Sequence, residues 1–237
     1  MALPENPLSL HEREEQIRRD SLRLIGERFL FREHLSMIHA SMAVIHVLAH
    51  DHQSAIEDEL TVQYLGLRLF NSAAASLRLS LSGYYQQAFA LVRDVFETVA
   101  LLDYMQSCPE QLAVWRRSNK SQRIAKFGPG AIRNAMNTRK EFQWGNRREI
   151  YSHMSEYAAN ATAPGFELLA PEGLWQIGPF LNEKYLKAWL EEIATYLAHG
   201  AVIFIAHFKK VQPPLLLKKR AFLDQVARWR AQCLVSS

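Results

Sequence analysis

Residues Tyr84–Met105, YYQQAFALVRDVFETVALLDYM, decide the fold class of the chain. On a helix of 3.6 residues per turn, the polar side chains of this segment fall within about 140°, and most of the remaining circumference is apolar. A helix with such a wide apolar arc packs against several neighbours, so a central helix is predicted here. At 1.5 Å per residue it would span about 33 Å, a full domain diameter.

Helical patterns also precede this segment. Ser9 and Glu12 are spaced as a capping box, which predicts that a helix begins there. The pattern continues to about His52, as one helix or as two helices joined near residues 28–32. A second long helix is predicted over residues 54–81.

Shorter helices are expected after the central one. Pro109 is predicted to open a helix that runs to about Lys126, because proline is favoured in the first turn. The Gly- and Pro-rich residues 127–130 indicate a loop. Two further helices are predicted, over residues 131–142 and 146–160.

An irregular stretch separates these helices from the last two. Residues 161–180 contain three Pro–Gly clusters, which are typical of a functional lid or a packed Ω-loop. A long apolar helix is predicted from Asn182 to about Lys210, with Pro213-Pro214 ending it. A basic terminal helix over residues 218–233 closes the chain.

These expectations define an all-α fold. We predict a single-domain helical bundle over residues 1–237, with about eight or nine helices and a long irregular loop near residues 161–180. Its parts are the long N-terminal helices 9–81, a core at about 80–210 and the basic C-terminal helix 217–234.

Composition limits the class of protein. The chain is 49% hydrophobic and 22% charged, which fits a globular protein, and its two cysteines exclude a disulfide framework. The N-terminus shows no secretory pattern, and the longest apolar run, near residues 201–206, is shorter than the ~20 residues that span a bilayer. A cytoplasmic protein without a membrane partner is expected.

The central helix carries a charged pair, Arg93 and Glu97, one turn apart. One interpretation is a partly buried ion pair that ties neighbouring helices together. The other is an arginine held ready for a phosphate by its carboxylate. The pair alone leaves both open.

A second candidate site lies at the predicted start of the 146–160 helix. It contains Arg147, Arg148, Tyr151 and His153. An arginine can hold a phosphate, a histidine can move a proton near neutral pH, and a helix N-terminus favours an anion. The alternative interpretation is that these residues have no catalytic role and form a solvated basic helix start with a surface histidine.

Histidines crowd the N-terminal helical region, and His39, His46 and His50 fall on one helical stripe. Two histidines one turn apart can share a metal ion, and Asp51, Glu57 and Asp58 could complete the site. Packing or surface roles are the alternative, and no metal or other cofactor is predicted as the main hypothesis.

Positive charge gathers at the C-terminal end. The cations there are Lys209, Lys210, Lys218, Lys219, Arg220, Arg228 and Arg230. The net charge of the whole chain is only +4, so this face is either simply solvated or follows a phosphate backbone.

Several of these features together resemble a known group. The Tyr84-Tyr85 start, Arg93 with Glu97, and the segment Tyr151–Tyr157, YSHMSEY, resemble HEPN-like all-α proteins and especially an uncharacterised bacterial helical family. The resemblance covers roughly residues 80–210. It implies a homodimer that cuts RNA without a metal ion, with the ribose 2′-OH as the nucleophile.

Carried onto this chain, the resemblance assigns phosphate binding to Arg148 or Arg147 and proton transfer to His153, supported by Tyr151. Glu149 departs from the residue that usually follows the arginine, and its charge would repel a phosphate. The hypotheses are therefore an RNA-cleaving or RNA-binding protein of the toxin or defence type, a non-catalytic module that binds a protein or nucleic-acid partner, and a His-rich metal-binding protein.

Overall fold

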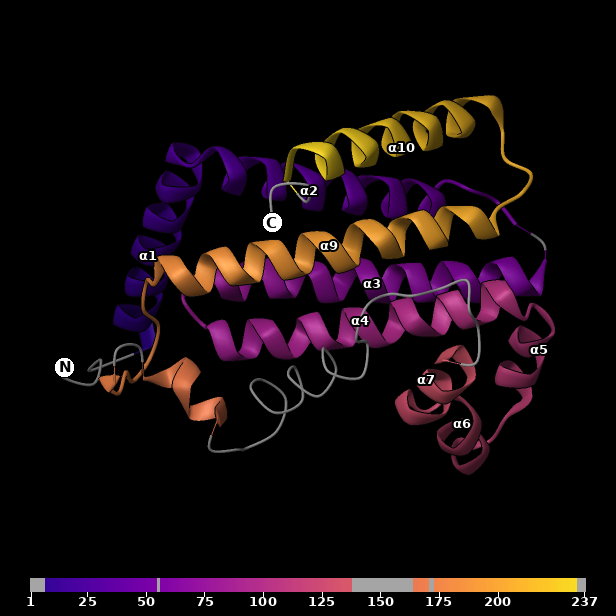
Figure 1. Ribbon diagram of the computed structural model, residues 1–237, viewed down its shortest axis with the longest axis horizontal. Helices are drawn as coiled ribbons and strands as arrows, with labels where there is room; N and C mark the ends of the chain where they lie inside the picture. Colours follow the sequence, from indigo (N-terminus) through magenta and orange to yellow (C-terminus); the bar gives the residue numbers. More distant parts are fainter. Residues whose placement is uncertain (1–6, 55, 138–163, 171–172, 234–237) are drawn as a thin grey trace.

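Helices supply the regular secondary structure of the residues described by the computed structural model, which are 7–54, 56–137, 164–170 and 173–233 (Figure 1). The predicted all-α class is confirmed. The helices are α1 (Pro7–Glu27), α2 (Phe29–His50), α3 (Glu57–Leu81), α4 (Tyr85–Ser107), α5 (Glu110–Arg117), α6 (Lys120–Phe127), α7 (Pro129–Asn137), α9 (Glu183–His207) and α10 (Pro213–Cys233), with the 3-10 helix η2 (Pro164–Leu169) before α9.

The core lies where α2, α3, α4 and α9 pack against one another. α4 and α9 run in the same direction. The rings of Tyr85 and Tyr185 meet near their first turns with centroids 5.6 Å apart, and His207 Nε2 lies 3.1 Å from the Leu102 carbonyl oxygen near their last turns. Parallel helices need a long return connection, and α5, α6, α7 and η2 lie on it.

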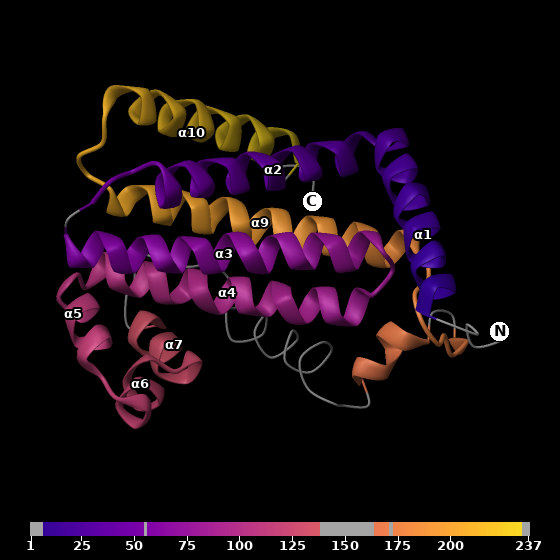
Figure 2. The ribbon, with the colours of Figure 1, turned by 180° about the vertical axis from the view of Figure 1, so that it is seen from behind.

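The other helices cover this four-helix core. α10 lies along α2, α1 crosses one end of the bundle, and α5–α7 pack on the opposite side, against α3 and α4 (Figures 1 and 2). One buried hydrophobic cluster runs from Ile25 to Trp229, so the first and last helices share a core with the middle of the chain.

Three buried side chains of the core, those of Trp189, Ser76 and Ser21, are paired by long-range hydrogen bonds. The Trp189 indole Nε1–H donates to Ser76 Oγ at 2.9 Å, and Ser76 Oγ donates to the Ala88 carbonyl oxygen at 2.8 Å. Ser21 Oγ donates to the Leu81 carbonyl oxygen at 3.0 Å. These bonds fix α1, α3, α4 and α9 relative to one another, because a buried donor without a partner is costly.

α9 is long and apolar enough to span a bilayer by length and composition, which the short run at residues 201–206 did not indicate. In the bundle, 67% of its most apolar 18-residue window is buried. A core helix of a globular protein passes the same length test, and the burial of α9 accounts for its apolar character without a membrane.

Several predicted boundaries are wrong. α1 begins at Pro7, so Ser9 lies inside the helix and does not cap it. The predicted helix from Pro109 to Lys126 is two helices, because Asn119 caps α6 in a box with Gln122. Of the two alternatives for the N-terminal pattern, two helices joined near residues 28–32 is confirmed, because α1 and α2 break at Arg28, which has an extended backbone.

Proline starts helices where loops or stops were predicted. Pro129 is the first residue of α7, so only Gly128 separates α6 from α7 in place of the predicted 127–130 loop. Pro213 and Pro214 likewise begin α10. Proline suits a first turn because its missing N–H would be unbonded there in any case.

Candidate functional site

The predicted charged pair at the centre of α4 is present. Arg93 Nε donates to Glu97 Oε1 at 2.9 Å, and the two side chains are 23% and 29% exposed. This bond joins two residues of one helix and is not itself a link between helices. The use of Arg93 to hold a phosphate stays a prediction.

The four residues predicted to carry catalysis, Arg147, Arg148, Tyr151 and His153, lie outside the described residues. The predicted 146–160 helix that would present them lies there too. Their roles remain predictions from the sequence.

Tyr84 and Tyr85, the tyrosines that begin the central segment, anchor α4. The Tyr84 hydroxyl donates to Glu14 Oε1 at 2.7 Å, and burial together with this carboxylate raises the pKa of Tyr84 to about 12. The Tyr85 oxygen accepts the backbone N–H of Asn182 at 3.1 Å, while burial raises the pKa of Tyr85 to about 12. Both phenols therefore stay neutral and link α4 to α1 and to the start of α9.

The histidine stripe on α2 is a surface feature. His39, His46 and His50 are exposed, and the rings of His46 and His50 stack with centroids 5.4 Å apart. His50 Nδ1 lies 2.8 Å from Asp51 Oδ1. Across the described parts of the chain, no group of three or more His, Cys, Asp or Glu side chains is placed to hold a metal ion.

Two of the three acidic residues that were predicted to complete a metal site, Glu57 and Asp58, have another partner. Arg116 donates to Asp58 and to Glu57 Oε2, the latter at 3.2 Å, which joins α5 to α3. These carboxylates therefore fix the α5 helix to the bundle.

Two other histidines of this region are structural. His34 is buried, and its Nδ1 accepts the indole N–H of Trp229 from α10 at 3.3 Å. His52 Nε2 lies 3.2 Å from Glu59 Oε2, and its ring packs edge-on against Phe208 with centroids 5.3 Å apart.

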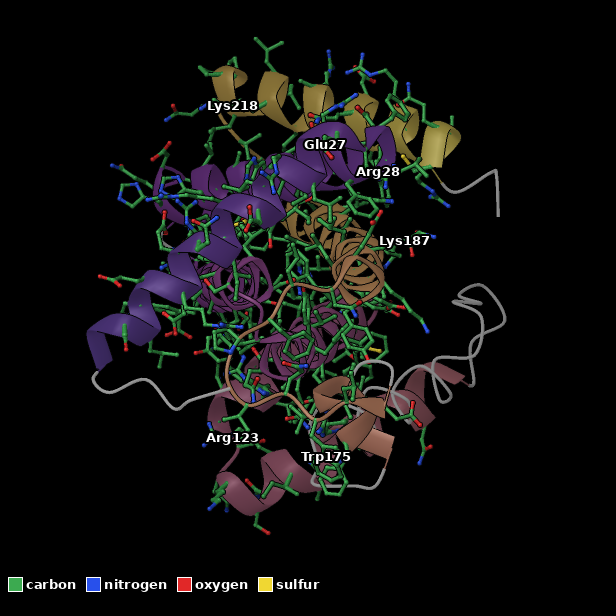
Figure 3. The ribbon with its side chains drawn as sticks, turned by 90° about the vertical axis from the view of Figure 1, so that its left-hand side faces the viewer. Glu27, Arg28, Arg123, Trp175, Lys187 and Lys218 are labelled. Atoms are coloured by element: carbon green, nitrogen blue, oxygen red, sulfur yellow. The ribbon has the colours of Figure 1, made fainter. Side chains whose placement is uncertain are left out.

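The basic residues of α10 and the preceding turn divide into two kinds. Lys219 donates to the Phe208 carbonyl oxygen at 2.8 Å, just after the end of α9, and burial lowers the pKa of Lys219. The other six are exposed and form no ion pair with a described carboxylate: Lys209, Lys210, Lys218, Arg220, Arg228 and Arg230. We call these six residues the α10 basic surface. Lys218 lies on the opposite side of the bundle from Arg123 and Trp175 (Figure 3).

A pocket of about 440 Å³ opens between α3, α4 and the α5–α7 helices; we call it the α4 pocket. Its inner wall is apolar and is formed by Leu65, Leu101, Phe127 and Ile132. Trp115 and Tyr64 add aromatic rings, and Arg68, Asp94 and Glu97 add charge. Arg68 donates to Asp94, whose other oxygen accepts from Ser72 Oγ at 2.6 Å.

No protein-family model, no curated protein and no solved structure matches this chain. Its function is therefore argued from its own residues.

The sequence analysis identified only Glu97 among the polar residues of the α4 pocket. Arg68 and Asp94 are 26 residues apart on different helices, so no local spacing connects them. Trp115 of α5 also lines the pocket. The pocket arises from how α5–α7 fold back onto α4, and that packing has no short sequence motif.

Proposed function

We propose that this chain binds RNA through the α10 basic surface and cleaves it without a metal ion, as a HEPN-like protein of the toxin or defence type. Arg148, with Arg147 beside it, holds the scissile phosphate. His153 is the general acid and base, and Tyr151 supports it. The chain acts as a homodimer, as the resemblance implies.

The observation that carries the binding half of this proposal is the set of unpaired cations. Residues 209–230 contain seven Lys and Arg but only one acidic residue, Asp224. On α1, by contrast, Arg18, Arg19 and Arg23 all pair with carboxylates of their own helix. Exposed cations without protein partners attract a phosphate backbone, because binding releases the counterions of the nucleic acid.

The chemistry needs only the residues proposed. His153 takes the proton of a ribose 2′-OH, the 2′ oxygen bonds to phosphorus, and the bond from phosphorus to the 5′ oxygen breaks. The leaving oxygen receives a proton from the imidazolium, so the products are a 2′,3′-cyclic phosphate and a 5′-OH. Arg148 stabilises the charge that develops on the phosphate oxygens.

Cleavage is tested with labelled RNA and purified protein in EDTA. The natural chain should give fragments that end in cyclic phosphate, and His153→Ala or Arg148→Ala should slow cleavage by about 100-fold or more. His39→Ala, which removes an exposed histidine from α2, is the matched control. Equal cleavage by natural chain and His153→Ala, or no cleavage by either, would overturn the mechanism. The same proteins can be compared in cells, where induced expression of the natural chain should arrest growth and expression of His153→Ala or Arg148→Ala should not.

Binding is tested separately by the salt dependence of RNA affinity. Replacing Lys218, Arg220 and Arg228 with Gln should lower the slope of log affinity against log salt by about 2 for single-stranded RNA. The control replaces Arg18, Arg19 and Arg23 with Gln, because these arginines already have carboxylate partners. An equal change of the slope in both triple variants would argue against the α10 basic surface as the RNA-binding site.

A non-catalytic interaction module is the second candidate function, and one observation favours it. The segment before α9 exposes Phe166, Leu174, Trp175 and Ile177, with Trp175 80% exposed (Figure 3). Apolar groups gathered on a surface mark contact sites for protein partners or for a second copy. Light scattering of the natural chain and Trp175→Ala tests the dimer, and an unchanged mass in the variant would remove this segment from the dimer interface.

A further inference from the structure

We infer that the α4 pocket binds a planar aromatic ring that carries an exocyclic amino group next to a ring nitrogen. The inference does not depend on the proposed RNA chemistry, since it rests on the volume of the pocket and on the groups that line it. These groups are contributed by α3, α4 and α5 and are all in the described part of the chain.

The volume and the apolar, aromatic lining of the pocket suit an aromatic ligand. A volume of about 440 Å³ lies within the range of small-molecule sites. Leu65 and Phe127 are buried in its wall, and Trp115 presents an indole to the same space. Aromatic rings pack well against such walls by stacking or edge contacts.

Tyr64 stands at the rim of the pocket and is available to a ligand. Its side chain is 71% exposed, and no hydrogen bond or ring contact engages it among the residues that the structure describes. An exposed aromatic ring at the mouth of a pocket can close over a flat ligand at little structural cost. We assign this role to Tyr64.

The polar lining offers an acceptor on α4 and a donor on α3, and the donor, Arg68, bonds to Asp94, one turn of α4 from Glu97. Glu97 Oε1 accepts from Arg93, and within the described residues Glu97 makes no other hydrogen bond, which leaves Oε2 as an acceptor. Arg68 is 60% exposed and uses one of its N–H groups on Asp94, which leaves further N–H groups as donors.

This acceptor and this donor match an amino-substituted heterocycle. The amino group donates to the Glu97 carboxylate, and the adjacent ring nitrogen accepts from the Arg68 guanidinium. A ring that carries a carbonyl in place of the amino group would put an acceptor against the carboxylate, which is repulsive. The pocket should therefore distinguish adenine from hypoxanthine, two rings of nearly equal size.

Such a ring reaches the pocket either as a free small molecule or as a base of a nucleic acid. The two sources share the same amino edge, so the probes are adenine, hypoxanthine, an oligoadenylate and an oligouridylate. Binding of adenine alone identifies a small-molecule site. Binding of oligoadenylate without measurable binding of adenine identifies a base-reading site.

Calorimetric titration of the full chain tests the inference. Adenine or oligoadenylate should bind at least about tenfold more tightly than hypoxanthine or oligouridylate, as expected for one hydrogen bond to a charged group. Glu97→Gln should remove most of this preference, and Tyr64→Ala should weaken binding several-fold. Phe29→Ala, which truncates an exposed aromatic outside the pocket, should bind like the natural chain.

Thermal unfolding of each variant separates misfolding from lost contacts. Tyr64→Ala changes an exposed side chain and should keep the natural melting temperature, so it tests the pocket even if Glu97→Gln unfolds. No binding of either amino-bearing probe, or binding that both pocket variants leave unchanged, overturns the inference. Binding without RNA cleavage would refute only the proposed nuclease.

Discussion

The indole N–H of Trp229 in α10 donates to Nδ1 of His34 in α2 across 3.3 Å, joining residues that are 195 positions apart in the chain. Both side chains are buried, at 4% and 3% exposure. The bond requires Nδ1 to be an acceptor, so it exists only while His34 carries no proton on that atom. The last helix is therefore attached to the bundle through a group that titrates.

Acid should weaken the fold through His34. Burial lowers the pKa of His34 below its ordinary value of 6.5, so the unfolded chain binds this proton more readily than the folded chain. The stabilisation is complete above about pH 6.5 and is lost as the pH falls toward the lower pKa of the folded state. The free energy of unfolding, measured by urea titration, should fall between about pH 7.5 and about pH 5.5.

His34→Gln isolates this contribution. The amide oxygen of glutamine can accept the Trp229 N–H but does not titrate, so the variant should show a shallower pH dependence. Burial also lowers the pKa of His207. His207 is present in the natural chain and in His34→Gln, so its contribution to the pH dependence is common to the two proteins. An identical pH slope in the two proteins would mean that His34 is not responsible.

Ser76→Ala should destabilise the core. Trp189 is fully buried, and its N–H bonds to Ser76 Oγ at 2.9 Å, so the variant leaves a buried donor without a partner. We expect a loss of about 1–3 kcal/mol in the free energy of unfolding. Ser36→Ala, at an exposed position of α2, should change it by less than about 0.5 kcal/mol. Similar values for the two variants would contradict the role of the bond.

The turn between α3 and α4 depends on Gly83. Its φ is +87°, and a Cβ there would lie 2.4 Å from the Phe180 carbonyl oxygen. Gly83→Ala should therefore cost more than the ~1–2 kcal/mol of left-handed strain alone. Gly173 has φ +76°, and a Cβ there would meet no atom of the described residues within 4 Å, so Gly173→Ala should show the strain without the clash. Equal melting temperatures for the two variants would show that the approach of Phe180 is unimportant.

Patterns within short stretches of sequence predicted the parts of the fold that are determined by residues close together in the chain. The wide apolar arc of Tyr84–Met105 predicted a central helix, and α4 is packed between α3 and α9. Asn182 was expected to lead into the long apolar helix, and its side chain caps α9 by accepting from the Tyr185 N–H at 3.0 Å. In both cases the determining residues are neighbours in sequence.

Other features were missed for two different physical reasons. The break before α6 had a local signal, because Asn119 and Gln122 bond reciprocally at 2.9 and 3.0 Å. It was missed because the helical pattern continues across the break, so one helix was predicted over residues 109–126. The α4 pocket had no local signal, because α3, α4 and α5–α7 meet there only after folding. Of the predicted site, the Arg93–Glu97 pair was accessible to sequence reasoning because an i, i+4 spacing is a local relationship.

The close approach of α4 and α9 depends on Gly200. A Cβ at this position would lie 2.4 Å from Val99 Cγ2, and a β-branched side chain held in a helix has little freedom to move away. Gly200→Ala should therefore lower the free energy of unfolding by about 1–3 kcal/mol through overpacking. A Cβ at Gly26, near the end of α1, would meet nothing within 4 Å in the described part of the chain, so Gly26→Ala should raise stability by up to about 1 kcal/mol through helix propensity. Urea titration should therefore show a lower free energy of unfolding for Gly200→Ala and a higher one for Gly26→Ala. A higher free energy of unfolding for both variants would show that α4 and α9 lie further apart.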